Sequence, residues 1–216
     1  MRAWERFADL RYSGEWHAHT SFTDGTATVD DMCRSAAGMG VPLVAFTEHV
    51  RRSLDYDMGL LLEQIDRARG EYDLTLLSGC EAKVLPDGTL DVAEEVLSSV
   101  DYPIFAYHSF PADKGLFLSS LRSVIASGRA HTWAHPGTFT ARTGIALSED
   151  ELREVMRLMS RHQVAMEINT RYMTPERRWV ELAKEEGVAM VRGSDVHSLA
   201  DMEGRDERWS RMGLRL

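Results

Sequence analysis

Glu15-Trp16-His17-Ala18-His19-Thr20 is the stretch that decides the expected fold, because it has the pattern of a short buried strand carrying two histidines. Side chains alternate between the two faces of a strand, so His17 and His19 would point into the same space. Imidazole is the commonest metal-ligating side chain, and two on one face can hold one ion. The alternative is a pair of unrelated surface histidines. The positions of the other histidines decide between these interpretations.

A unit of one amphipathic helix and one short apolar strand recurs along the chain. The first unit has helical spacing over 29–39, with Thr28 and Asp31 as a capping box and Gly40 as the stop. Further helices are expected over 58–69, after Asp91 with Glu94 as its capping partner, and over 116–127, 148–161 and 174–186. The strands expected after these helices are 42–47, 74–79, 103–107, 130–134, 164–168 and 188–192.

Counted from 15–20, these strands number seven, at about 31 residues per unit, which is close to the spacing of a β/α barrel. Strict alternation of apolar strands and amphipathic helices predicts a parallel sheet with helices outside. We therefore expect an α/β fold, a TIM-barrel-like barrel of seven strands. Active sites in such barrels lie at the carboxyl ends of the strands, and six of the seven expected ends carry a potential metal ligand.

The composition fits one globular domain over residues 1–216, with 44% hydrophobic and 27% charged residues. The sequence has no long apolar run and no signal-peptide pattern at its amino end, so we expect a cytoplasmic protein without a membrane partner. Cys33 and Cys80 have no paired spacing and are expected to be reduced and buried. The net charge of −9 disfavours a dedicated nucleic-acid binder.

The candidate metal ligands share one setting, the carboxyl end of an expected strand, and are His17, His19, Asp24, His49, Glu81, His108, His135, Asp195 and His197. Nine nitrogen and oxygen donors exceed what one tetrahedral ion uses, so the pattern indicates a multinuclear centre. Imidazoles mixed with carboxylates suit zinc, manganese or iron. His131 and His162 fall elsewhere and are interpreted as structural, and Glu48 is an alternative ligand to His49.

The ordered motifs resemble the polymerase and histidinol phosphatase (PHP) family over residues 15–198. They are His17-Ala18-His19-Thr20, Thr23-Asp24-Gly25, Thr47-Glu48-His49, Glu81, His108-Ser109, Ala134-His135-Pro136 and Gly193-Ser194-Asp195-Val196-His197-Ser198. One departure is Glu48, where family members more often have Asp. The resemblance implies a distorted seven-stranded β/α barrel that binds a trinuclear metal centre and hydrolyses phosphoesters. It also implies three ligand sets: His17, His19, Glu81 and Asp195; Glu81, His108 and His135; and Asp24, His49 and His197.

The expected function is hydrolysis of a small phosphomonoester, such as histidinol phosphate or a nucleotide-like molecule, with two to three divalent ions as cofactors. A metal-activated hydroxide would be the nucleophile, and Glu81 would bridge two ions beside it. Asp195 and His197 are candidates for proton transfer, with a metal-bound water as the alternative. Other open functions are a nuclease or proofreading phosphodiesterase, an amidohydrolase acting on a non-phosphate substrate, and a noncatalytic metal-binding module.

Basic side chains near the strand ends are candidates for binding the phosphoryl group, because a guanidinium gives it two parallel hydrogen bonds. Arg171 follows Asn169 at a strand end and is the preferred candidate, and Arg142 lies in the expected long loop after His135. Lys83, Arg51 and Arg52 are weaker candidates. Residues 199–216 are expected either to form a last helix against the barrel or to meet a partner, and the oligomeric state is left open.

Overall fold

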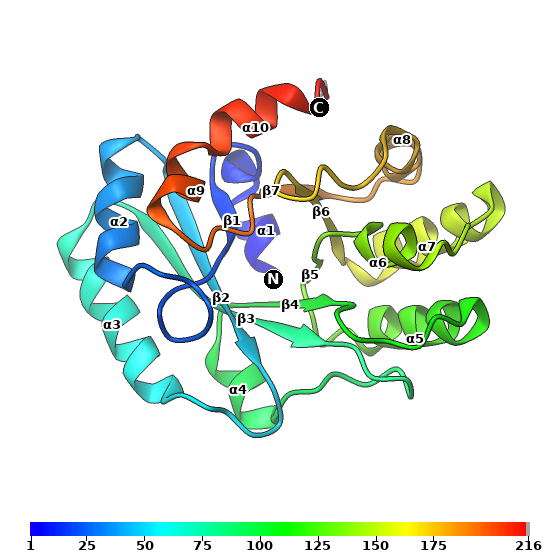
Figure 1. The fold of residues 1–216 in the computed structure, drawn as a ribbon, viewed down its shortest axis with the longest axis horizontal. Helices are drawn as coiled ribbons and strands as arrows, with labels where there is room; N and C mark the ends of the chain where they lie inside the picture. The colour runs from blue at the N-terminus through cyan, green and yellow to red at the C-terminus, as the bar shows by residue number, and fades with distance from the viewer. Residues whose placement is uncertain (215–216) are drawn as a thin grey trace.

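The computed structural model describes residues 1–214, and its seven strands form one parallel sheet in the order β1 to β7. The strands are β1 (Glu15–Ala18), β2 (Leu43–Val50), β3 (Thr75–Lys83), β4 (Tyr102–Ala106), β5 (Thr132–Trp133), β6 (Ala165–Asn169) and β7 (Met190–Gly193). The connecting helices are α2 (Val29–Gly38), α3 (Met58–Glu71), α4 (Glu94–Ser99), α5 (Lys114–Ser127), α6 (Thr138–Thr143), α7 (Glu149–His162) and α8 (Arg177–Glu185). The helices lie around the strands (Figure 1).

The sheet curls into a nearly closed barrel, which confirms the expected fold. The two edges of the sheet meet at the carboxyl end of β1, where its last residue, Ala18, forms a parallel bridge with Val196 from the segment after β7. The His19 amide donates to the Val196 carbonyl at 2.8 Å, and the Val196 amide donates to the His17 carbonyl at 3.0 Å. The barrel is distorted, since β5 has only two residues. The closure brings the residues after β7 against those after β1.

The amino-terminal segment closes the opposite end of the barrel. It contains α1 (Ala3–Arg6) and the 3₁₀ helix η1 (Ala8–Leu10), whose apolar side chains pack against an inner cluster that includes Trp16 and Tyr102. The Trp16 indole donates to the Leu10 carbonyl at 3.0 Å. Large apolar side chains therefore fill the barrel at the amino ends of the strands. A site can form only at the carboxyl ends.

Period-2 alternation along each strand sends the candidate ligands inward. In β2, Leu43 and Ala45 belong to the inner apolar cluster, and His49 has the same parity. In β3, Leu77 is inner, so Glu81 points inward while Cys80 packs in the outer core. The interior therefore changes from apolar at the amino ends to polar at the carboxyl ends.

Several boundaries differ from the expected ones. β2 and β3 extend to Val50 and Lys83, so His49 and Glu81 lie within strands rather than after them. The capping boxes Thr28/Asp31 and Ser148/Glu151 are confirmed. The one predicted at Asp91 is wrong, because α4 starts at Glu94 with Ala93 as its N-cap and no side-chain cap.

The segment after His135 is not the long loop that we expected. It contains the short helix α6, which places Arg142 in its last turn. Gly137 and Gly144 flank this helix with φ of 93° and 71°, in the left-handed region that glycine adopts without steric cost. The two glycines therefore allow a sharp entry and exit that fold the segment back over the barrel mouth.

Residues 199–214 pack against the barrel as two short helices, α9 (Leu199–Glu203) and α10 (Arg205–Arg211). Arg205 is buried, and its Nε donates to Glu15 Oε2 at 3.1 Å. The Trp209 ring lies under the Arg192 guanidinium at 5.0 Å. The helical alternative for this segment is thus confirmed over its described part, and residues 215 and 216 lie outside the description.

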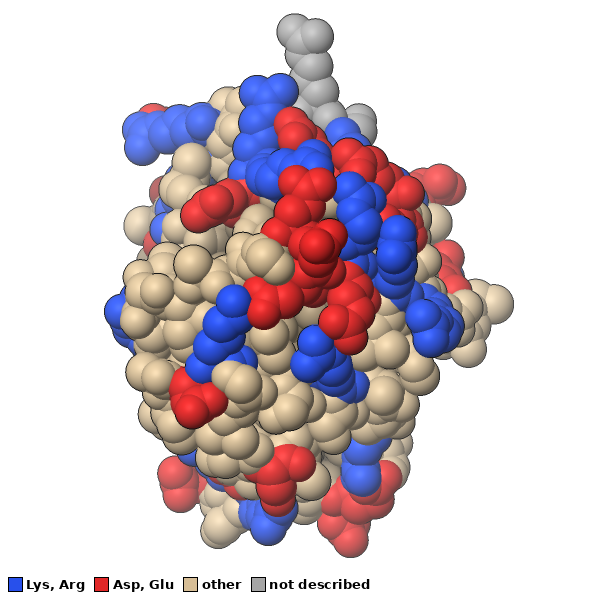
Figure 2. All heavy atoms as spheres, turned by 90° about the vertical axis from the view of Figure 1, so that its right-hand side faces the viewer, with Lys and Arg blue, Asp and Glu red and all other residues tan. Residues whose placement is uncertain are grey.

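Acidic and basic side chains are interleaved on the side of the molecule where α7 and α8 lie (Figure 2). Arg153 donates to Glu186 at 2.6 Å and to Glu185 at 2.9 Å, and Arg178 donates to Glu149 at 2.6 Å. These cations are paired with carboxylates, so this face is not a uniformly basic surface. Within residues 1–214 none of the helices has the length and apolar character needed to cross a membrane.

Candidate metal centre

All nine candidate ligands converge at the carboxyl end of the barrel, around the buried carboxylate of Glu81. Glu81 Oε1 lies 3.1 Å from His108 Nε2 and 2.9 Å from His135 Nε2. Its Oε2 lies 3.7 Å from His17 Nε2 and 3.6 Å from His19 Nε2. One carboxylate thus faces imidazoles from the ends of three strands, β1, β4 and β5.

The deepest part of the site, which we call the inner group, consists of His17, His19 and Asp195, all buried. The two Nε2 atoms of the histidines are 3.0 Å apart, and Asp195 Oδ1 lies 3.5 Å from one and 3.3 Å from the other. Burial lowers the pKa of His19 to about 4. Burial also opposes protonation of His17, but the charges of Glu167, Asp195 and Glu81 outweigh it and raise the pKa of His17.

Next to it lies the central group, Glu81 with His49, His108 and His135. Burial would raise the pKa of Glu81, but nearby His17 and hydrogen bonds from His108 and His135 hold it well below its usual range. Glu81 is therefore an anion at neutral pH, as a ligand must be.

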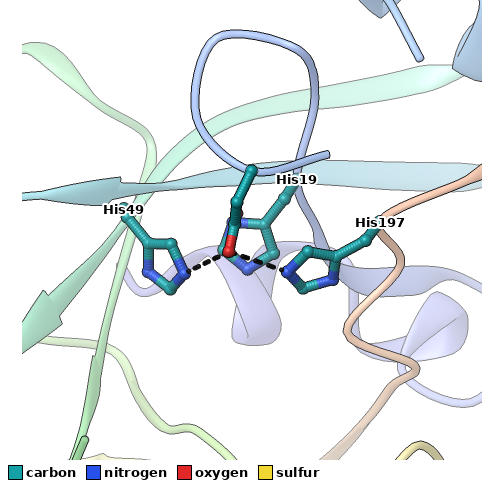
Figure 3. A group of neighbouring side chains, drawn as sticks. His19, His49 and His197 are labelled. Atoms are coloured by element: carbon teal, nitrogen blue, oxygen red, sulfur yellow. Dashed lines mark ion pairs between the residues drawn. The ribbon is translucent and has the colours of Figure 1, made fainter. Parts of the chain in front are cut away.

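The outer group consists of His19, Asp24, His49 and His197 (Figure 3). Asp24 Oδ2 lies 3.3 Å from both His49 Nε2 and His197 Nε2. The Asp24 side chain is 53% exposed, whereas those of His17, His19 and Asp195 are at most 5% exposed. The outer group is thus the part of the site that solvent reaches most easily.

The donor set fits divalent cations. His19 Nδ1 and His49 Nδ1 are buried without a hydrogen-bond partner. His49 Nδ1 lies 2.9 Å from Glu81 Oε2, which is an ion-pair contact and not a hydrogen bond. Buried polar atoms are rarely left unsatisfied, and a cation between these imidazoles and carboxylates would satisfy them.

Two of the candidate ligands have an unusual backbone. His135 and Asp195 have φ of 32° and 49°, and only two other non-glycine residues in 1–214 have positive φ. Such conformations cost about 1–3 kcal/mol each and cluster at functional sites, where surrounding contacts hold them. In this chain they turn two side chains sharply into the barrel mouth.

Glu167 is a site residue that the sequence analysis missed. It is buried on β6, and its Oε1 accepts a hydrogen bond from His17 Nδ1 at 2.9 Å, while Oε2 accepts from the His135 amide. With Nδ1 protonated, His17 presents its Nε2 lone pair to the inner group. Gly193 makes room for this carboxylate, because a Cβ there would lie 1.8 Å from Glu167 Oε1. A charged residue within an apolar strand was the available signal.

Glu48, which was considered as an alternative metal ligand, instead accepts hydrogen bonds from the loop after β1. Its carboxylate accepts from the Thr20 amide at 2.7 Å and from the Thr23 hydroxyl. It therefore fixes the loop that carries Asp24, and the geometry favours His49 over Glu48 as the ligand.

The basic candidates occupy three different settings. Arg142 lines the cavity of about 360 Å³ over the site and donates to the His108 carbonyl. Arg171 lies beside this cavity, where its Nη1 donates to the Asp195 carbonyl at 3.0 Å and comes within 3.5 Å of Asp201. Lys83 is not among the lining residues, and its Nζ lies 3.9 Å from Asp91. The geometry thus favours Arg142 for contact with a ligand.

Tyr172 also lines the cavity and was not predicted. Its ring meets that of His135 edge to face, with 5.4 Å between centroids. It is 45% exposed beside the site. Nothing in the local sequence distinguishes this tyrosine from other loop residues, because its position depends on how the chain turns after β6.

The sequence also matches a known family profile, that of the PHP domain, over residues 15–208. The chain belongs to the PHP domain family. Its relatives include the Bacillus subtilis DNA polymerase/3'-5' exonuclease PolX, which is 28% identical over 86% of this chain. The match spans only 34% of the length of PolX. Another is the Escherichia coli protein named "Probable phosphatase YcdX", 28% identical over 88% of this chain and 81% of its own length.

A solved PHP-like fold supports the same architecture. Histidinol phosphate phosphatase from Lactococcus lactis, in complex with zinc, L-histidinol and phosphate, superimposes with a TM-score of 0.68. The superposition covers 94% of this chain and 95% of that protein, at 16% sequence identity. At this identity the likeness concerns the fold alone.

Because the outer group is the most exposed, we expect a chelator to remove its ion first. In the loaded protein, release should show a fast phase of one ion and a slower phase for the remainder, measured with a metal-sensitive dye. Asp24→Asn should remove the fast phase and keep the slow one. Release of all ions in a single phase from the unchanged protein would contradict this order.

Proposed function

We propose that this chain is a metal-dependent phosphoesterase that hydrolyses small phosphomonoesters, with three divalent ions held by the inner, central and outer groups. The observation that carries the proposal is the convergence of nine donors at one end of the barrel, where seven of them line one cavity together with Arg142. Bound divalent ions lower the pKa of a coordinated water and stabilise charge on phosphoryl oxygens. The family match and the names of the relatives support the same reaction class.

In this proposal Glu81 belongs to the central group and also serves the inner group, because its Oε1 faces His135 and its Oε2 faces His19. Arg142 binds the phosphoryl oxygens that face the cavity. His197 Nδ1 lies 2.8 Å from the Asp195 carbonyl oxygen and 3.2 Å from Arg171 Nη1, and its Nε2 lies 3.3 Å from Asp24 Oδ2 in the outer group. Asp195 and His197 remain the proposed proton-transfer pair, with Asp195 held anionic because nearby His17 and a hydrogen bond from His19 lower its pKa despite burial.

The test is a panel of phosphomonoesters assayed with metal-free protein to which manganese, zinc or iron is added, alongside a single-stranded oligonucleotide and an amide. We expect metal-dependent release of phosphate from small esters and slow digestion of the oligonucleotide. Faster digestion of the oligonucleotide would favour the nuclease alternative, and metal binding without turnover would favour a noncatalytic module. The single domain over 1–216, the cytoplasmic location and the identity of the ions stay predictions.

The two arginines can be separated by mutation. Arg142→Ala should raise KM for a phosphomonoester about tenfold or more, because it removes a charge-assisted contact. Arg171→Ala is expected from its position at the strand end to raise KM as well, but its contact with His197 Nδ1 at 3.2 Å predicts an added loss of outer-group metal. KM and bound metal measured for both variants check this. Unchanged KM in either variant would remove that arginine from the substrate site.

A further inference from the structure

The barrel closes at the seam between β1 and β7, and this seam differs from the other strand contacts. Each of the other pairs of neighbouring strands forms a ladder, whereas within residues 1–214 one isolated bridge, between Ala18 and Val196, joins the two edges. The inner group spans the seam, because His17 lies on β1 and Asp195 follows β7. The separation of the edges therefore decides whether His17 Nε2 and Asp195 Oδ1, 3.5 Å apart, can share one ion.

Glu15 joins the two edges of the seam through its side chain. It is fully buried at the start of β1, and its Oε1 accepts from the His17 amide at 3.2 Å on the same strand. The same oxygen accepts from the Ser194 amide at 2.7 Å, across the seam and directly before Asp195. Asp195 has a left-handed φ of 49°, a conformation that persists only where surrounding contacts hold it. One carboxylate oxygen thus holds the backbone beside a ligand on each edge.

Arg205, on α10, holds the Glu15 carboxylate in place, and we call these two residues the seam pair. Arg205 is only 2% exposed, and its Nε donates to Glu15 Oε2 at 3.1 Å. Its Nη2 donates to the Gly14 carbonyl at 2.5 Å and to the Ser13 carbonyl at 3.2 Å. The cost of burying two charges largely offsets their attraction, so such a pair is better suited to fixing geometry than to adding stability.

The helix that carries Arg205 also contacts the other edge of the seam. Asp206 accepts from Arg192 Nη2 at 2.6 Å, and Trp209 lies under the same guanidinium. Arg192 belongs to β7, so Arg205 and Asp206, which are adjacent in sequence, bind opposite edges of the barrel. Figure 1 shows α10 beside β1 and β7.

We propose that Arg205 and Glu15 are positioning residues for the inner group. Arg205 orients the Glu15 carboxylate, which sets the distance across the seam. At this distance His17 and Asp195 bind one ion. The inference rests on the proposed function, because it requires the ion of the inner group. Through the seam pair, α10 influences this ion although it contributes none of the nine candidate ligands.

The outer group has supports of its own. Glu48 holds the loop that carries Asp24. The Asp201 carboxylate accepts from the His197 amide at 3.1 Å. A defect in the seam pair should therefore affect the inner ion selectively.

The test is chelator competition on zinc-loaded protein, with Arg205→Lys as the first variant. Lysine keeps the charge but lacks the planar fork that reaches Glu15 and Gly14 together. We expect zinc at the inner group to bind about tenfold more weakly, as is usual when an outer-shell partner of a metal ligand is lost. The fast phase of zinc release, from the outer group, should not change. Glu15→Asp, whose shorter side chain cannot span the seam, should give the same selective loss. In the double variant the two losses should not add, because Arg205 acts through Glu15.

Two control variants separate positioning from other effects. Arg211→Lys is the matched control, since Arg211 is exposed on the same helix and pairs only with Glu207 among the described residues. Val124→Ala controls for stability, because it removes buried apolar volume under α5, which follows β4, a strand far in order from the seam. It should lower the melting temperature and leave zinc binding at the inner group unchanged.

Zinc affinity at the inner group that is equal in Arg205→Lys and the unchanged protein would overturn the inference and leave the proposed function standing. Additive losses in the double variant would do the same, as would a loss in Val124→Ala as large as that in Arg205→Lys. Zinc binding at the inner group without hydrolysis of any phosphomonoester would overturn the proposed function alone. Failure of the unchanged protein to bind zinc would overturn both.

Discussion

Glu81→Ala is expected to lower kcat for phosphomonoester hydrolysis by about a thousandfold or more and to reduce the number of bound ions. Glu81 is buried and is the only carboxylate among the described residues that faces His17, His19, His49, His108 and His135 together. Its removal takes away a carboxylate that faces both the inner and the central group. The surrounding imidazoles, and the ions proposed between them, then lose their shared anionic partner. A loss of about 4 kcal/mol of transition-state stabilisation corresponds to this decrease in rate.

The measurement pairs steady-state kinetics with the metal content of the purified variant. Glu81→Gln is the second variant, because it keeps the volume and isolates the loss of charge if alanine disturbs folding. Glu154→Gln is the matched control, since Glu154 is exposed on α7 and only pairs with Arg122 at 2.8 Å. Full activity of Glu81→Gln with unchanged metal content would refute the proposed bridging role.

The candidate ligands were predictable because two simple rules place them. Parallel strands end at one edge of the barrel, and alternation along a strand gives residues two apart the same face. These rules predict that His17 and His19 share one space, and they bring His49, Glu81 and Asp195 to the same mouth although the sequence separates them widely. The ends of the strands were less predictable, since β2 and β3 continue through His49 and Glu81 to pair with each other.

Residues that act through tertiary contacts were not predictable in this way. Glu48 and His49 are adjacent, and only the position of the loop after β1 shows that Glu48 holds Thr20 and Thr23. Arg142 was a predicted candidate, but its position over the cavity depends on the unexpected helix α6, whose exit requires the left-handed Gly144. Spacing along the sequence does not show which distant part of the chain a side chain contacts. These roles could therefore be identified only from the three-dimensional structure.

Glu167 provides the strongest test of such tertiary contacts. Glu167→Ala should weaken ion binding at the inner group by about ten- to a hundredfold, because the loss of a carboxylate that orients a metal-binding histidine usually has this effect. Its two oxygens are surrounded by three donors: His17 Nδ1, the His135 amide and Asn169 Nδ2 at 3.1 Å. Without the Glu167 carboxylate, His17 loses the partner that fixes its tautomer and ring orientation.

Glu167→Gln should weaken binding as well, because its amide must turn an NH₂ group toward one of the three donors. Gly193→Ala provides an independent route to the same defect, since the added Cβ would collide with the Glu167 carboxylate. Chelator competition gives the affinity of the ion at the inner group without reference to catalysis, and Glu154→Gln is again the control. If the alanine and glutamine variants at position 167 both bound the ion at the inner group as tightly as the unchanged protein, then the ligands alone would orient His17, and the buried carboxylate would serve only the packing of β6 against β7.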